Sequence, residues 1–514
     1  MLIKTYSCAL MGVAAIPITI EVSVEIGVNF FLVGLPDSAV KESQQRIDTA
    51  LKSCGYKIPG KKIVINMAPA DIRKEGSAFD LTLAMGILIA SEQITPLKNV
   101  ADYYIMGELS LDGSIQPVRG ALPVAIEARK RGKKGVILPL ANAKEAAIVS
   151  DIEVLGAENI RQVIDYFQDG IAISPMTIDT REEFHKSLNE YELDFSDVKG
   201  QENIKRALEI AAGGGHNAIL IGSPGSGKTM LAKRLPSILP PMTLNEALET
   251  TKIHSVAGKM GRYSSLISVR PFRSPHHTIS DVALVGGGTH PQPGEISLAH
   301  NGVLFLDELP EFKRTVLEVM RQPLEDRYVT ISRSKYTVEF PASFMFLAAM
   351  NPCPCGNYNH PSKKCTCSPG EVQRYLNKVS GPLMDRIDIH VEVVPVSHEE
   401  LASPSTGERS ESIRERVMEA RDIQRKRFQS ISGTFCNAQM NSNLVGSFCN
   451  ITREGQELLK LAMERLGLSA RAYDRILKVA RTIADLDHKQ DIEIGHLSEA
   501  INFRSLDRDN WGRL

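Results

Sequence analysis

A glycine-rich run near the middle of the chain has the residue types that bind phosphate. Residues 222–229 are Gly-Ser-Pro-Gly-Ser-Gly-Lys-Thr and match the P-loop pattern in full. Glycines let a backbone wrap so closely around an anion that its N–H groups point at the phosphate oxygens. Residues 218–221 predict a strand before the loop, and residues 230–235 predict a helix after it, whose positive N-terminal end adds to the attraction. The predicted binding residues are Gly222, Ser223, Pro224, Gly225, Ser226, Gly227, Lys228 and Thr229.

The last two residues of this loop have individual roles in the predicted site. Lys228 is expected to bind the β- and γ-phosphates of a nucleoside triphosphate, and Thr229 to offer its hydroxyl to Mg²⁺. The alternative, a glycine-rich turn that matches by chance, does not explain the strand and the helix on either side.

Two further apolar runs end in polar side chains that suit hydrolysis. Residues 303–306 predict a buried strand that ends in Asp307 and Glu308, and residues 344–350 predict one that ends at Asn351. We expect Asp307 to hold Mg²⁺ through its water shell, because Mg²⁺ keeps several waters. Glu308 would polarise the attacking water and Asn351 would orient it. The alternatives are a solvated turn for the two carboxylates and a simple turn former for the amide.

Four of the eight cysteines are clustered. Cys353 and Cys355 are separated by nine residues from Cys365 and Cys367. Residues i and i+2 of an extended chain share a face, so each pair could reach one ion, and four thiolates suit structural Zn²⁺. The one-residue gaps differ from the usual two-residue spacing, so a reduced loop without metal stays an alternative.

The elements that must position these residues form an α/β protein. Residues 1–170 predict a compact domain, residues 171–195 a linker, and residues 196–397 an open parallel sheet with helices. Residues 398–514 predict a helical domain. Strands are predicted at 28–35, 62–67, 135–139, 218–221, 303–306, 344–349 and 387–393, and helices at 79–91, 411–429 and 475–486.

Bulk properties exclude some classes of protein. The chain has 514 residues, 43% of them hydrophobic and 24% charged, which is typical of globular domains and not of a disordered chain. The net charge of −1 provides no global field for nucleic acid, so any binding must rely on local basic residues. The apolar run 9–18 is short and contains a proline, which favours a buried strand over a signal peptide. We therefore expect a cytoplasmic protein.

Five motifs resemble the magnesium-chelatase-like AAA+ ATPases, and within them the ComM/YifB family. The resemblance covers essentially the whole chain and is far more specific than a P-loop alone. The motifs are residues 270–277 (Arg-Pro-Phe-Arg-Ser-Pro-His-His), 302–310, 351–356 (Asn-Pro-Cys-Pro-Cys-Gly), 380–388 (Ser-Gly-Pro-Leu-Met-Asp-Arg-Ile-Asp) and 469–475 (Ser-Ala-Arg-Ala-Tyr-Asp-Arg).

The resemblance implies roles for several basic residues. Arg386 resembles the arginine finger that reaches the γ-phosphate of a neighbouring subunit, with a salt bridge to a nearby aspartate as the alternative. Arg471 resembles the sensor arginine of a helical lid domain, with Arg475 as the alternative. Residues 328–340 alternate as a β-hairpin does, and Arg333 and Lys335 near its tip resemble the pore residues of ring helicases that contact DNA phosphates. A solvated turn is the alternative for this tip.

The N-terminal domain resembles the α+β fold of Lon protease without its active site. Residues 74–80 resemble the loop with the Lon serine, and residues 117–123 resemble the loop with the Lon lysine. In this register the serine position is Ala78 and the lysine position is Leu122. A serine nucleophile needs an adjacent base, so peptidase activity is not expected.

The resemblance implies an ATP- and Mg²⁺-dependent homohexameric ring that acts as a DNA branch migration helicase in natural transformation. One alternative is an ATP-driven protein remodeller that uses the N-terminal domain to hold clients. Another is a motor subunit of a metal chelatase, although such subunits generally lack a Lon-like domain.

Overall fold

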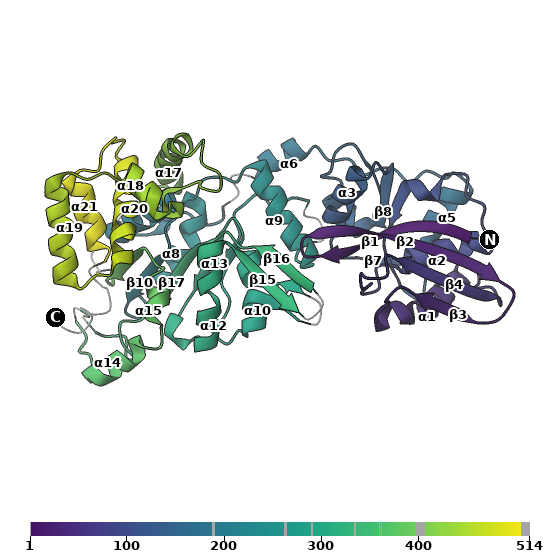
Figure 1. The fold of residues 1–514 in the computed structure, drawn as a ribbon, viewed down its shortest axis with the longest axis horizontal. Coiled ribbons are helices and arrows are strands. Elements are labelled where there is room, and N and C mark those ends of the chain that lie inside the picture. Colours follow the sequence, from purple (N-terminus) through teal and green to yellow (C-terminus); the bar gives the residue numbers. More distant parts are fainter. Residues whose placement is uncertain are drawn as a thin grey trace. The chain divides into compact units, whose positions relative to one another are not determined.

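A computed structural model describes residues 2–187, 191–261, 265–288, 291–333, 336–358, 360, 362–396 and 407–504 of the chain (Figure 1). The chain divides into two compact units. The N-terminal unit comprises Met1–Leu188 together with Thr243–Ser268, and the C-terminal unit comprises Asn189–Met242 and Val269–Leu514. Among the described residues, no helix combines the length and the apolar character needed to cross a bilayer.

The N-terminal unit begins with a four-stranded sheet in the order β1-β2-β4-β3. Its first three strands in this order pair antiparallel, and β3 pairs parallel with β4. The apolar run 9–18 was predicted as one buried strand, but it covers the end of β1, the turn at Gly12–Val13 and the start of β2, which pair antiparallel. The elements are β1 (Leu2–Met11), β2 (Ala14–Glu25), β3 (Phe30–Val33), α1 (Ser38–Ser53), β4 (Lys62–Ala68) and α2 (Asp80–Ala90), of which the fully buried α2 packs against β1 and β2.

A parallel three-stranded sheet completes this unit, in the order β5-β8-β9. The predicted strand 135–139 is β8. The elements are β5 (Tyr103–Ile105), β6 (Glu108–Leu109), β7 (Ile115–Gln116), α3 (Ala121–Lys130), β8 (Gly135–Pro139), α4 (Leu140–Ala146), β9 (Glu153–Ala157), α5 (Ile160–Gln168) and α6 (Thr180–Ser187). The last of these helices lies in the segment that the sequence predicted as a linker.

Helix α9 (Leu244–Val256) groups with the N-terminal unit, although its sequence position suggested the ATPase core at 196–397. The helix packs against α3. The backbone N–H of Gly120 donates to the carbonyl of Ser255 at 3.1 Å, and the Ser255 hydroxyl donates to the buried carboxylate of Glu145. Helical periodicity shows that a helix has an apolar face to bury, but it does not show which unit that face packs against. Sequence order alone therefore could not assign α9 to a unit.

The C-terminal unit contains a five-stranded parallel sheet in the order β11-β14-β17-β10-β18. The strands are β10 (Ala218–Gly222), β11 (Phe272–Arg273), β14 (Val303–Leu306), β17 (Met345–Met350) and β18 (Ile389–Val393). The predicted strands 218–221, 303–306, 344–349 and 387–393 are thus confirmed within two residues. The central strands are buried on both faces, as their continuous apolar runs require.

Short helices and two hairpins surround this sheet. The predicted hairpin is β15 (Tyr328–Arg333) with β16 (Tyr336–Pro341), paired antiparallel. Lys335 lies outside the described residues, and so does the side chain of Arg333. The other elements are α7 (Glu202–Gly214), α8 (Lys228–Arg234), α10 (Asp281–Val285), β12 (Gly286–Gly287), β13 (Gln292–Pro293), α11 (Glu295–Leu298), α12 (Arg314–Val319), α13 (Arg321–Asp326), α14 (Pro369–Leu376) and α15 (Gly381–Met384).

The chain is helical from residue 410 to residue 502, and these helices share one apolar core with the sheet. Helix α20 presents Ile476, Val479, Ala480 and Ile483 to that core, as the sequence predicted. The predicted boundary at 397/398 falls among residues outside the described part. The helices are α17 (Ser410–Arg427), α18 (Ser442–Phe448), α19 (Arg453–Leu466), α20 (Ala470–Leu486) and α21 (Ile494–Asn502) (Figure 1).

A buried carboxylate ties these helices together and gives a stability test. Asp485 on α20 is fully buried, accepts hydrogen bonds from Arg427 and Asn437 at 2.8 Å each, and pairs with Arg481. Asp485→Ala should lower the free energy of unfolding by about 3–5 kcal/mol, because buried guanidinium groups lose their counter-ion. Urea denaturation measures the change.

Asp422 on α17 provides the control, because it pairs with Arg425 while both side chains are more than half exposed. Asp422→Ala should cost less than about 1 kcal/mol. Equal losses in the two variants would contradict the role given to Asp485.

Candidate nucleotide site and cysteine cluster

The carboxyl ends of three neighbouring parallel strands bring the predicted nucleotide residues together. β14, β17 and β10 are adjacent in the sheet and run in one direction. The P-loop follows β10, Asp307 and Glu308 follow β14, and Asn351 follows β17. In open parallel sheets, ligands bind outside the carboxyl ends of the strands. One edge of the sheet therefore presents all these groups.

The P-loop has the backbone and the unsatisfied groups of an anion site. Gly225 and Gly227 have φ of 79° and 90°, a left-handed conformation that glycine adopts without strain. The buried hydroxyls of Ser223 and Ser226 make no hydrogen bond within the described residues. A buried hydroxyl without a partner costs free energy, and phosphate oxygens would supply the missing acceptors. These residues fit a bound phosphate.

The Lys228 ammonium lies buried within the loop. Its Nζ donates to the carbonyls of Gly222 at 2.7 Å and Ser223 at 2.9 Å. Burial lowers the pKa of Lys228, while the nearby carboxylates of Asp307 and Glu308 act to raise it. The cation is thus held among oxygen atoms at the base of the loop.

The side chains expected around Mg²⁺ and water form two contacting pairs. The Thr229 hydroxyl donates to Asp307 Oδ2 at 2.6 Å, and the Glu308 backbone N–H donates to Asp307 Oδ1 at 2.9 Å. Lys228 Nζ donates to Asn351 Oδ1 at 3.3 Å. A hydroxyl beside a carboxylate is the oxygen donor set that holds hydrated Mg²⁺, so these residues fit the ion.

A histidine pair that the sequence analysis did not assign lies beside Glu308. His277 Nδ1 is 3.4 Å from Glu308 Oε2, and the ring centroids of His276 and His277 are 4.1 Å apart. The pair follows β11, which is adjacent to β14, so it reaches the same sheet edge. With only two residues, β11 is too short for a periodic signal, which is why the pair was missed.

Arg386 is buried within its own chain. It pairs with Glu325 on α13 at 2.6 Å and donates to the carbonyl of Pro382 on α15 at 2.7 Å. Its Nε has no partner among the described residues, and it lines a pocket between α12, α13 and β15. Its carbonyl accepts from the side chain of Asn217, which directly precedes β10. Arg386 thus lies near the amino edge of the sheet.

The two arginines at the start of α20 differ in their surroundings. Arg475 forms an ion pair with the buried Asp388, which directly precedes β18. Burial acts to raise the pKa of Asp388, but Arg475 and His216 together hold it below its ordinary value. Arg471 lies one turn earlier and is exposed. Both arginines are therefore near the amino edge of the sheet, opposite the P-loop edge.

The positions expected for the Lon dyad hold no nucleophile and base. The Ser77 hydroxyl donates to the carboxylate of Glu108, and the Lys74 ammonium donates to the carbonyl of Pro69. Leu122 is buried in the first turn of α3. The lysine and the serine of the first loop thus both have other partners.

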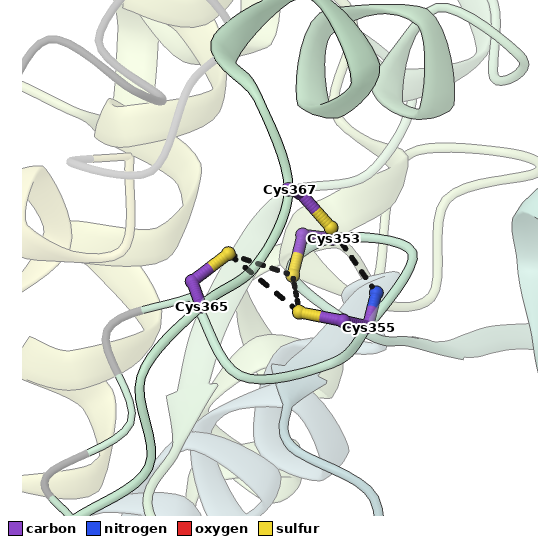
Figure 2. A group of neighbouring side chains, drawn as sticks. All are labelled: Cys353, Cys355, Cys365 and Cys367. Atoms are coloured by element: carbon purple, nitrogen blue, oxygen red, sulfur yellow. Dashed lines mark hydrogen bonds between the residues drawn. The ribbon is translucent and has the colours of Figure 1, made fainter.

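The four clustered cysteines converge on one point. Figure 2 shows their side chains turned toward one another, and all four sulfur atoms lie within 4.8 Å of one another. The Sγ atom of Cys353 is 3.4 Å from that of Cys355 and 3.7 Å from that of Cys365. Tetrahedral Zn²⁺ with Zn–S bonds of about 2.3 Å would place sulfur atoms about 3.8 Å apart. The cluster thus fits one ion of this size.

One thiol of the cluster, that of Cys355, has a lowered pKa. Backbone N–H groups of Thr366 and Asn357 lower the pKa of Cys355 to about 5, which favours its thiolate. His360 lies between the two cysteine pairs in sequence, but its Nδ1 accepts the backbone N–H groups of Ser362 and Lys363. The group whose ligand atoms converge within the described residues consists of the four cysteines.

Three sequence models of protein families match the chain. "Magnesium chelatase, subunit ChlI" matches residues 194–401, its C-terminal model matches residues 407–504, and "Subunit ChlI of Mg-chelatase" matches residues 20–142. The nucleotide residues and all four clustered cysteines lie within the first match.

Two curated proteins are similar to this chain over nearly its full length, and a third is similar to part of it. Competence protein ComM of Haemophilus influenzae is 44% identical over 505 residues, which cover 98% of this chain and 97% of that protein. YifB of Escherichia coli is 43% identical over 97% of this chain and 96% of its own length. Lon protease 2 of Bacillus subtilis is 30% identical over 154 residues, or 30% of this chain and 26% of that protein.

The contacts of Lys228 predict the effect of its removal. Lys228→Ala should weaken ATP binding about 10- to 100-fold, because charge-assisted hydrogen bonds to the phosphates contribute roughly 1.5–3 kcal/mol. Titration with a fluorescent ATP analogue measures the affinity. Lys233→Ala is the matched control, because Lys233 lies on the same helix and is exposed. Wild-type affinity in Lys228→Ala would remove the lysine from the phosphate site.

Proposed function

The chain belongs to the ComM/YifB family of magnesium-chelatase-like AAA+ proteins, and we propose that it is an ATP-hydrolysing ring motor that drives DNA branch migration in natural transformation or recombination. The observation that carries the ATPase proposal is the convergence of the P-loop, Asp307, Glu308 and Asn351 at one sheet edge. The full-length similarity to a protein named for competence supports the DNA proposal. We place the activity in the cytoplasm.

Each group at this edge has a proposed task in hydrolysis. Lys228 and the P-loop N–H groups bind the β- and γ-phosphates, and Thr229 and Asp307 hold Mg²⁺. The ion, when bound, neutralises phosphate charge. Glu308 accepts the proton of the attacking water, which Asn351 orients, so that ATP and water give ADP and phosphate.

In this proposal, each nucleotide site receives its arginines from a neighbouring subunit of the ring. Neither 222–229 nor 303–308 contains an arginine that could neutralise the γ-phosphate. Arg386 and Arg471 lie near the opposite sheet edge from the P-loop of their own chain, so both are proposed to act on a neighbour's nucleotide. For Arg386 this requires release from Glu325. A head-to-tail interface of this kind closes into a ring, for which we propose six subunits.

DNA binding is proposed for the hairpin β15–β16. The net charge of −1 leaves only local basic groups to contact phosphates, and the hairpin tip contains Arg333 and Lys335. Similarity to Lon protease in the N-terminal unit favours a protein remodeller as the second candidate. The chelatase family models favour a chelatase motor as the third.

DNA should stimulate ATP hydrolysis if this proposal is correct. We expect four-way or forked DNA to raise the ATPase rate of the wild-type chain, measured by phosphate release. Glu308→Gln is the control, because it keeps the shape of the side chain, binds ATP and should hydrolyse it slowly with or without DNA. Stimulation by unfolded protein and not by DNA would favour remodelling instead.

Mixed rings test whether Arg386 acts on a neighbour. Arg386→Ala and Glu308→Gln should each bind ATP but hydrolyse poorly, and mixing them should restore part of the activity. Some mixed interfaces join an intact Glu308 to an intact Arg386. Mixed rings as inactive as either parent would contradict the trans assignment. Full activity in Arg386→Ala alone would transfer the role to another arginine, with the exposed Arg374 next in line.

We also propose that Cys353, Cys355, Cys365 and Cys367 bind one structural Zn²⁺. The converging sulfur atoms support this assignment. Purified chain should contain about one Zn²⁺ by elemental analysis, and replacing Cys365 and Cys367 with serine should release it. Cys436 and Cys449 are buried and outside the cluster, so their replacement with alanine should leave the zinc content unchanged. Metal-free wild-type protein with a normal melting curve would contradict the site.

A further inference from the structure

The cysteine loop lies directly against the P-loop. Gly356, the residue after Cys355, has a φ of 78°, and a Cβ atom added to it would lie 2.4 Å from Cδ of Pro224. Pro224 is the third residue of the P-loop. The backbone of the cysteine loop therefore touches the loop that binds phosphate, at a point with no room for a side chain.

Both ends of the cysteine loop also lead to Asn351. Cys353 follows Asn351 by two residues and is fully buried. Cys367 directly precedes Ser368, whose side chain caps α14 in a capping box with Glu371. Tyr375 on the same helix is buried, and its hydroxyl lies near the backbone of Asn351.

These contacts form a continuous path from the sulfur atoms to the P-loop. Asn351 accepts from Lys228, and Pro224 belongs to the same loop as Lys228. A metal that joins both cysteine pairs would close the segment between them and fix its two ends. Without the metal, no bond would join the two cysteine pairs, and the contact of Gly356 with Pro224 would lose this support.

We propose that the thiolate-bound metal acts as a clamp on the nucleotide site, holding the P-loop and Asn351 in the geometry that binds phosphate. This inference rests on the proposed zinc site. It adds that the ion, besides stabilising the cysteine loop, raises the affinity of the P-loop for nucleotide. Coupling of this kind is reciprocal at equilibrium, so bound nucleotide must in turn tighten the binding of the metal. Gly356 and Pro224 are positioning residues in this arrangement.

Two variants distinguish the effect of the bound metal from the effect of the contact between Gly356 and Pro224. Cys365→Ser with Cys367→Ser removes the metal, whereas Gly356→Ala keeps all four thiols and forces a Cβ into Pro224. Both should weaken binding of fluorescent ADP by about 5-fold or more, a typical size for coupling between sites. Gly356→Ala should retain its zinc. Gly370→Ala is the control, because a Cβ there meets no atom within 4 Å, and it should change neither property.

Equilibrium competition for zinc with a chromogenic chelator supplies a readout that needs no ATP hydrolysis and no DNA. ADP should raise the chelator concentration needed to remove zinc from wild-type protein and have little effect in Gly356→Ala. Wild-type nucleotide affinity in the folded, metal-free double variant would overturn the clamp. So would wild-type affinity and ADP protection in zinc-loaded Gly356→Ala. Protein without zinc would refute the metal site itself, while a lack of DNA stimulation would refute only the proposed DNA motor.

Discussion

Parallel strands must all end at the same edge of their sheet, and the candidate nucleotide site depends on this constraint. The order β14-β17-β10 places the two carboxylates, the amide and the P-loop next to one another, although they are up to about 130 residues apart in sequence. The strands that carry them are buried on both faces, so their positions are fixed by apolar packing rather than by the polar groups themselves.

The sequence was enough to predict which groups lie at the carboxyl ends of β10, β14 and β17. It was not enough to predict which residues contact them. Runs such as 303–306 are apolar, short and followed by carboxylates, so both the strand and its chemistry were predictable. The two-residue strand β11 has no periodicity to detect, and the contact of His277 with Glu308 depends on it. The placement of α9 on α3 was equally unpredictable, because an amphipathic helix does not specify its partner.

Cysteine spacing predicted that four thiols could share an ion, and the folded chain does bring their sulfur atoms together. Spacing could not show what the loop rests on. That contact depends on Gly356, where the absence of a side chain and a left-handed φ allow the backbone to touch Pro224. A glycine in a sequence indicates only that the backbone there can approach another group closely. Which group it approaches depends on the fold.

The two edges of the sheet carry different groups. Asp388 and Asn217 directly precede β18 and β10, and they contact Arg475 and the backbone of Arg386. Gly222, the first residue of the P-loop, is five positions after Asn217 along β10, a distance of about 16 Å at roughly 3.3 Å per residue. A single arginine side chain is shorter than this. The chain therefore has its candidate phosphate-binding groups at one edge and its candidate γ-phosphate arginines near the other, which is the arrangement that the proposed head-to-tail ring requires.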